Sequence, residues 1–127
     1  MNAYLVAVSV DRPGVLSRLL AASAARGVNV APAYGLSDGK IGLICLGSDD
    51  EEGLQAAIAD AGYSATAIEM IVTELENKPG TGAELFGKLA AAGVSLLVAV
   101  PVGMNGDRVQ FALGATDPAL LRATLGR

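Results

Sequence analysis

The chain has no histidine and no tryptophan, and Cys45 is its single cysteine. These absences exclude a Ser-His-Asp or Cys-His catalytic pair, an intramolecular disulfide, and a zinc site that combines thiolate and imidazole groups within one chain. Cys45 lies in the apolar run 41–46, where a free cysteine packs like a small hydrophobic side chain. We therefore predict no catalytic residues, no metal site and no cofactor.

Charged and aromatic residues are also sparse, at 17% and 4%, and the formal net charge is -4. Nucleic-acid partners require a basic face and often a platform of stacked aromatic rings, so we predict no nucleic-acid partner. No apolar run has the length of a membrane span, and residues 1–10 do not resemble a signal peptide. The sequence predicts no membrane partner and a cytoplasmic location.

What the chain does have is a hydrophobic fraction of 52% in 127 residues, enough for one medium domain or two small ones. Residues 11–30 and 77–96 repeat the same pattern: a Pro-Gly pair, an apolar helical stripe and a Gly-Val pair. A shift of 66 positions without a gap superimposes them. It places Pro13, Gly14, Leu19, Gly27 and Val28 on Pro79, Gly80, Leu85, Gly93 and Val94. We interpret this repetition as a duplication.

Both copies predict the same order of elements. Alternating residues in 5–10 and 71–75 indicate strands, and each is followed by a helix that begins near the Pro-Gly pair and ends at Gly27 or Gly93. The predicted inner stripes of these helices are Leu16, Leu19, Leu20 and Ser23 in the first copy and Leu85, Phe86 and Leu89 in the second.

A hairpin and a second helix follow in each copy. Strands 28–36 and 41–46 flank Asp38-Gly39, and strands 96–102 and 109–113 flank Asn105-Gly106. Acidic caps at 49–52 and at Asp117 then precede the second helices. Pro32 and Pro101 each fall in the second predicted strand, which places that strand at a sheet edge.

The fold class that follows is α+β, with two ferredoxin-like (βαββαβ) modules whose antiparallel sheets carry helices on one face. We predict a first module at 1–68 and a second at 69–127, with the closing strand of the second absent. The segment 63–76 then closes the first module and opens the second. The missing strand leaves an open edge, which favours a homodimer or a higher homo-oligomer.

The run Asp11-Arg12-Pro13-Gly14-Val15-Leu16, followed by Gly27-Val28-Asn29-Val30, resembles the ACT-domain family. This motif is similar in sequence to the serine-binding regulatory domain of phosphoglycerate dehydrogenase. The resemblance covers the first copy throughout and residues 77–96 of the second. It implies two ACT modules side by side, no enzymatic activity, and a free amino acid or similar small zwitterion held between the modules.

The resemblance also implies the site residues. Backbone amides at a helix N-terminus would hold the ligand carboxylate, glycine would let the backbone approach, and Asp or Asn would accept from the ammonium. On that analogy Asp11 works with Ser95, and Asn77 with Asn29. The ligand-binding residues expected are Ser9, Asp11, Pro13, Gly14, Val15, Leu16, Asn29, Asn77, Pro79, Gly80, Thr81 and Ser95.

Simpler interpretations remain open for several of these residues. Asp11 and Asn77 have the side chains of helix caps, Asn29 and Ser95 suit strand ends, and the Pro-Gly glycines suit turn geometry alone. The family's serine-binding version has a histidine where this chain has Ser9 and Leu75, so the resemblance does not imply serine as the ligand.

Three functions remain. The first is an amino-acid sensor whose occupancy changes its association or its partner contacts. The second is a regulatory or structural subunit that binds an enzyme partner without a ligand of its own. The third is an acyl-phosphate hydrolase of ferredoxin-like fold, for which Arg12 beside the first Pro-Gly pair is the single indication. The duplicated Pro-Gly turn favours the first.

Overall fold

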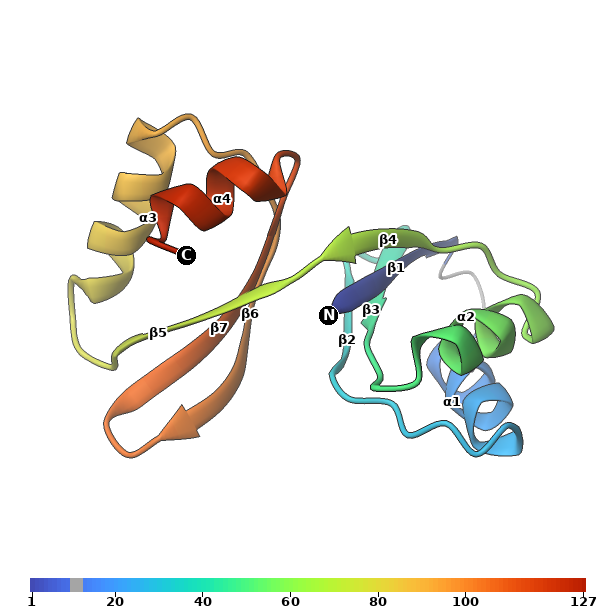
Figure 1. Ribbon diagram of the computed structural model, residues 1–127. Coiled ribbons are helices and arrows are strands. Elements are labelled where there is room, and N and C mark those ends of the chain that lie inside the picture. Colours follow the sequence, from blue (N-terminus) through green and yellow to red (C-terminus); the bar gives the residue numbers. More distant parts are fainter. Residues whose placement is uncertain (10–12) are drawn as a thin grey trace. The chain divides into compact units, whose positions relative to one another are not determined.

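The computed structural model describes residues 1–9 and 13–127, which form two compact units, Met1–Ile68 and Glu69–Arg127. The elements are labelled in Figure 1. The first unit contains β1 (Asn2–Ser9), α1 (Val15–Ala25), β2 (Ala33–Ser37), β3 (Ile41–Leu46), α2 (Glu51–Asp60) and β4 (Thr66–Glu69), which reaches the boundary. The second contains β5 (Ile71–Glu76), α3 (Thr81–Ala91), β6 (Leu96–Asn105), β7 (Arg108–Ala115) and α4 (Pro118–Thr124).

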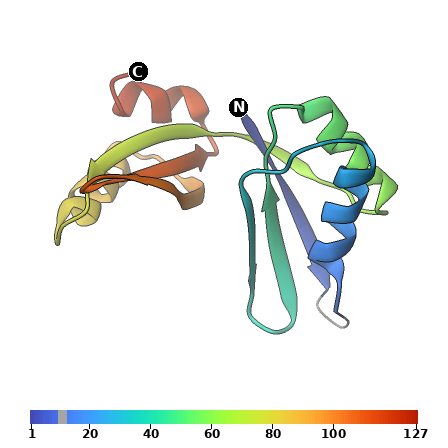
Figure 2. The same ribbon diagram turned by 90° about the horizontal axis from the view of Figure 1, so that it is seen from below.

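The sheet of the first unit has the strand order β2-β3-β1-β4, which is the ferredoxin-like order. β3 pairs antiparallel with both β1 and β2, and the register sets Val6 opposite Ile44. Because side chains alternate along a strand, Val6, Val8 and Ile44 point to one face, where α1 and α2 pack (Figures 1 and 2). The predicted α+β fold with helices on one sheet face is confirmed here.

The core of the first unit is formed by α1, α2 and the face of the sheet that they cover. Leu19 of α1 and Leu54 of α2 are fully buried, and they pack with Val6 and Leu46 from the sheet. The stripe predicted for α1 is only partly right. Leu16 and Leu20 are 38% and 37% exposed, because the helix turns Leu19 and Ser23 inward instead.

The second unit has the strand order β5-β7-β6, with both neighbouring pairs antiparallel. Its core packs Leu89 of α3 and Leu121 of α4 against Leu113 of β7. The rings of Phe86 and Phe111 meet edge to face beside it, with centroids 6.0 Å apart. Within the residues described for this unit, the sheet has three strands, so the outer edge of β5 carries no neighbouring strand.

The helix ends follow the predicted local chemistry. Gly27 and Gly93 have φ angles of 70° and 81°, a region that glycine enters without a Cβ penalty, and each ends its helix as predicted. The side chain of Asp50 accepts from the amide of Gly53 at the start of α2. Asp117 caps α4 in the same way through the amide of Leu120.

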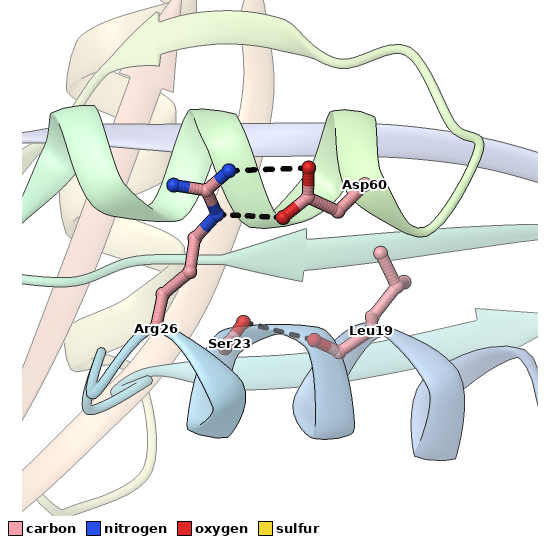
Figure 3. A network of polar contacts seen from close by, with 4 residues as sticks. All are labelled: Leu19, Ser23, Arg26 and Asp60. Atoms are coloured by element: carbon pink, nitrogen blue, oxygen red, sulfur yellow. Dashed lines mark hydrogen bonds and ion pairs between the residues drawn. The ribbon is translucent and has the colours of Figure 1, made fainter.

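One ion pair ties the two helices of the first unit together at their ends. Arg26, just after α1, donates from Nε to the Asp60 carboxylate at the end of α2, 2.6 Å away, and from Nη2 at 3.2 Å (Figure 3). Nearby, the buried hydroxyl of Ser23 donates to the carbonyl oxygen of Leu19. The hydroxyl is thereby satisfied within its own helix.

The strand predicted over 28–36 is too long, because β2 begins at Ala33. Pro32 precedes the strand, and the chain before it is held by other bonds: Ala31 donates to the carbonyl of Gly47, and the hydroxyl of Ser48 donates to the carbonyl of Asn29. Pro101 does lie in the edge strand β6, beside a register shift between residues 101 and 103, as its missing N–H requires. Across residues 1–9 and 13–127, none of the helices combines the length and the apolar character that crossing a membrane requires.

Candidate functional site

The second Pro-Gly turn connects β5 to α3. Gly80 is the N-cap residue of α3, with a φ of 93°, and Pro79 lies just outside the helix. The hydroxyl of Thr81 lies 2.6 Å from the carbonyl oxygen of Glu76 and 3.0 Å from that of Lys78, so its single proton is shared between the two acceptors. This shared hydrogen bond connects α3 to the end of β5 and restricts the conformation of the turn.

The interpretation of Asn77 as a helix cap is wrong. The N-cap residue of α3 is Gly80, three residues after Asn77. No side chain in the described part of the chain forms a capping hydrogen bond there. The amide of Asn77 instead donates to the carbonyl of Asp107 in the β6–β7 turn, 2.7 Å away. Gly80 does serve the geometry of the turn, because its φ is one that residues with a side chain rarely adopt.

Three backbone amides at this turn have no acceptor. Lys78 and Thr81 donate to the carbonyls of Glu76 and Lys78, whereas Gly80, Gly82 and Ala83 find no acceptor within residues 1–9 and 13–127. The first amides of any helix lack intrahelical acceptors, and the aligned peptide dipoles give this end a partial positive charge. The first turn of α3 therefore offers two free donors toward an anion, the amides of Gly82 and Ala83.

An open hollow of about 340 Å³ lies within the second unit and is lined in part by the first residues of α3. Its lining combines two leucines and a threonine with charges of both signs: Leu75, Leu85, Thr81, Lys78, Arg108, Glu76 and Glu84. Lys78 pairs with Glu76 at 2.8 Å, and Arg108 pairs with Glu74 at 2.5 Å. Glu84 makes no ion pair with any residue that the structure describes, so its carboxylate is available to a cation.

The first Pro-Gly turn is built differently. Gly14 caps α1 with a φ of 101° and accepts from the amide of Arg18. The Arg18 guanidinium folds back over the turn, with Nη1 3.5 Å from the carbonyl oxygen of Pro13 and Nη2 2.9 Å from the Tyr63 hydroxyl. A Cβ added to Gly14 would lie 3.1 Å from this Nη1. Asp11 lies outside the described residues.

The other predicted residues are spread along their own units. Ser9 ends β1 opposite Ile41 on the face away from the helices, and Leu16 is exposed on α1. Val15 packs partly against the core of the first unit. Asn29 lines a separate hollow of about 250 Å³ together with Ser48, Asp49 and Asp50. Ser95 is exposed before β6, where its carbonyl accepts from the amide of Thr116.

The structure thus brings Thr81 into a hollow with groups that the sequence prediction did not select. The proposed pairs Asp11 with Ser95 and Asn77 with Asn29 join residues of different units and stay predictions. Arg108 was missed, although its place could have been deduced. The Asn105-Gly106 turn puts Arg108 at the start of β7, and pairing of β5 with β7 sets it opposite Glu76.

Comparison with solved structures identifies the fold of the chain. A protein of Bacteroides thetaiotaomicron superposes with a TM-score of 0.80 at 15% identity, covering 98% of this chain and 85% of that one. The regulatory subunit of aspartate kinase from Thermus thermophilus gives 0.65 at 18%, covering 98% and 91%. Aspartate kinase from Clostridium acetobutylicum gives 0.66 at 11%, covering 98% of this chain but 31% of that enzyme. No protein-family model and no curated protein matches the sequence. The chain has the fold of two ferredoxin-like ACT modules.

Proposed function

We propose that this chain is a non-catalytic regulatory protein that binds a free amino acid at the Pro-Gly turn before α3. The observation that carries the proposal is the first turn of α3, where the amides of Gly82 and Ala83 have no acceptor in the described residues and where Thr81 and Glu84 line a hollow with charges of both signs. A zwitterion needs a donor site and an acceptor site within a few ångströms, and these amides together with Glu84 supply the two kinds of group.

Each end of the ligand has a candidate partner. The α-carboxylate accepts from the amides of Gly82 and Ala83, where the dipole of α3 adds to the attraction. Glu84 accepts from the ammonium, because its carboxylate is not committed to an ion pair in the described part of the chain. Leu75 and Leu85 form the apolar part of the lining. Leu75 offers no polar group, which disfavours a ligand with a short hydroxylated side chain such as serine.

The fold supports a regulatory role. The solved protein from Thermus thermophilus that is similar over 98% of this chain is a regulatory subunit rather than a catalytic one. A ligand shifts a conformational equilibrium only if it binds one state more tightly than the other. We propose that occupancy favours one association state of the chain, either with itself or with an enzyme.

A thermal-shift screen of the twenty amino acids, followed by calorimetry on any that stabilise the protein, tests the proposal. A ligand at a hundredfold over its dissociation constant adds about 2.7 kcal/mol to the free energy of unfolding of the part that binds it. The proposal expects at least one amino acid to do so. A flat screen at millimolar concentrations contradicts it.

The variant Ala83→Pro locates the site. Proline removes the amide hydrogen of residue 83, which has no acceptor in the fold, and proline is tolerated in the first turn of a helix. Gly82 before it lacks a Cβ, which reduces the steric restriction on the residue preceding proline. We expect at least tenfold weaker binding. Ala83→Ser keeps the amide and is the matched control, with affinity near that of the unmodified protein.

One observation favours the second candidate, a subunit that binds a protein partner without a ligand. Leu36, Ile41 and Leu43 are 81%, 66% and 49% exposed, and they adjoin one another on the sheet face opposite α1 and α2. Contiguous apolar surface of this kind marks interaction sites. A flat amino-acid screen together with concentration-dependent association that Leu43→Lys abolishes would favour this candidate over the first.

A further inference from the structure

A third hollow, away from the second Pro-Gly turn, lies in the first unit between α2 and the segment that leads into β4. Its volume is about 250 Å³. Ala59, Ala65 and Ala67 line it, and their small side chains leave the space that larger residues would fill. Ile58 is 2% exposed and contributes an apolar surface from the core. The hollow therefore has room and an apolar wall.

Two of the chain's three tyrosines meet at this hollow. Tyr4 comes from β1 and is 4% exposed, whereas Tyr63 comes from the loop after α2 and is half-buried. Tyrosine combines a ring that packs against apolar ligands with a hydroxyl that forms directional hydrogen bonds. In a chain with 4% aromatic residues, this convergence gives the hollow the composition of a small-molecule site.

Both tyrosine hydroxyls are held in place, and two hydrogen-bonding groups remain. The Tyr4 hydroxyl donates to Glu51 Oε1 at 2.8 Å and accepts from Gln55 Nε2 at 2.9 Å. The Tyr63 hydroxyl accepts from Arg18 Nη2. Within residues 1–9 and 13–127, the Tyr63 hydroxyl proton has no acceptor and the side-chain oxygen Oε1 of Gln55 has no donor. The residues that line the hollow thus include one uncommitted donor and one uncommitted acceptor.

The size and the polar groups select a class of ligand. An apolar cavity of roughly 150 Å³ holds one benzene ring, so a hollow of about 250 Å³ accommodates a single ring with a substituent. A phenolic hydroxyl both donates and accepts, and so complements the two free groups. We propose that the hollow of Tyr4, Gln55 and Tyr63 is a second binding site, specific for small phenols.

Titration with phenol, followed by the backbone amide signals of the protein, tests this proposal. We expect saturable shifts at Gln55, Ser64 and Ala65, and no shift at Gly82 or Ala83. Cyclohexane-1,2-diol, which has hydroxyls but no aromatic ring, should bind at least tenfold more weakly. Shifts that grow linearly without saturation, or that spread over both units, overturn the proposal.

Two variants and one control test whether phenol binds in this hollow. Ala65→Leu fills the hollow, and Gln55→Leu removes the free acceptor from an exposed position, so each should weaken phenol binding at least tenfold. Should Ala65→Leu fail to fold, Gln55→Leu alone decides. Ala24→Leu adds the same bulk on an exposed part of α1 and should bind as the unmodified protein does. Equal affinity in all three variants overturns the site. Because these residues are separate from the second Pro-Gly turn, where the amino acid is proposed to bind, the outcome is independent of the amino-acid screen.

Discussion

The hydroxyl of Thr81 donates to the carbonyl oxygen of Glu76, 2.6 Å away, and so ties the first residue of α3 to the last residue of β5. The two residues are five positions apart, and the turn between them contains the Pro-Gly pair. In the first copy the residue that corresponds to Thr81 is Val15, which has no hydroxyl. The second turn is therefore closed by a side chain that the first turn lacks.

Thr81→Val should loosen this turn. Valine keeps the shape of threonine but cannot donate to the carbonyls of Glu76 and Lys78, and a hydrogen bond of this kind contributes about 1 kcal/mol. We expect a comparable loss in the free energy of unfolding of the second unit, measured by denaturant titration. Thr81→Ser retains the hydroxyl and should recover most of the loss. Equal stability of the valine variant would mean that the turn is held by other contacts.

Gly80→Ala should destabilise the second unit by about 1–2 kcal/mol, because φ at this position is 93° and a Cβ is strained there. No atom lies within 4 Å of the added Cβ, so the cost is conformational rather than steric crowding. Gly87→Ala in the middle of α3 is the matched control. It also meets no atom and should stabilise the helix by about 0.5–1 kcal/mol. Denaturant titration of both variants checks the opposite signs.

The parts of the fold that local chemistry determines could be predicted. Gly27 and Gly93 end their helices, Asp117 caps α4, and the 66-residue repeat gives the order of elements. The helix ends and caps depend on residues within one turn of the chain, and the repeat can be read by aligning the sequence with itself. The segment 63–76 also runs from the first sheet into the second as predicted, since β4 and β5 are separated by Met70 alone.

The parts that depend on contacts between distant residues could not be predicted in the same way. Asn77 has the side chain of a helix cap, but its backbone is held by Asp107 from another turn. Leu16 has the spacing of a core residue, yet α1 packs through Leu19. The candidate hollow requires Arg108 to face the Pro-Gly turn, which follows from the β5–β7 register and not from its own neighbours.

The ion pair between Arg26 and Asp60 should make the first unit sensitive to acid. Hydrogen bonding to Arg26 lowers the pKa of the Asp60 carboxyl below its ordinary value of 3.8. The folded state therefore holds this carboxylate more strongly than the unfolded state does. The stabilisation is present above pH 3.8 and is lost as the pH falls through the lowered pKa. Both groups are exposed, so we expect a small effect.

Asp60→Asn tests that expectation. The variant should melt at a lower temperature than the unmodified protein at pH 7, and the difference should shrink at a pH below that lowered pKa, where the unmodified carboxyl is protonated as well. Asp49→Asn is the matched control, because no ion pair of Asp49 occurs within the described residues. A difference for Asp60→Asn that stays constant with pH would exclude the charge as its cause.

At alkaline pH Tyr4 is one group that should reduce stability. Burial, and then the hydrogen bond to Glu51 and its negative charge, raise the pKa of the Tyr4 hydroxyl above 10.0. The unfolded chain loses this proton near pH 10, whereas the folded chain retains it, so rising pH favours unfolding until the raised pKa is passed. Tyr4 should therefore lower the stability of the unmodified protein between pH 10 and its raised pKa.

Tyr4→Phe removes this titration. It also removes the hydrogen bonds to Glu51 and Gln55, so it should cost about 1 kcal/mol at pH 7. Above pH 10 the variant should lose stability less steeply, and the two curves of unfolding free energy against pH should converge. Tyr34→Phe, a change in the edge strand β2, is the control for the general effect of removing a tyrosine. Parallel curves for Tyr4→Phe and the unmodified protein would show that the Tyr4 hydroxyl titrates alike in the folded and unfolded chains.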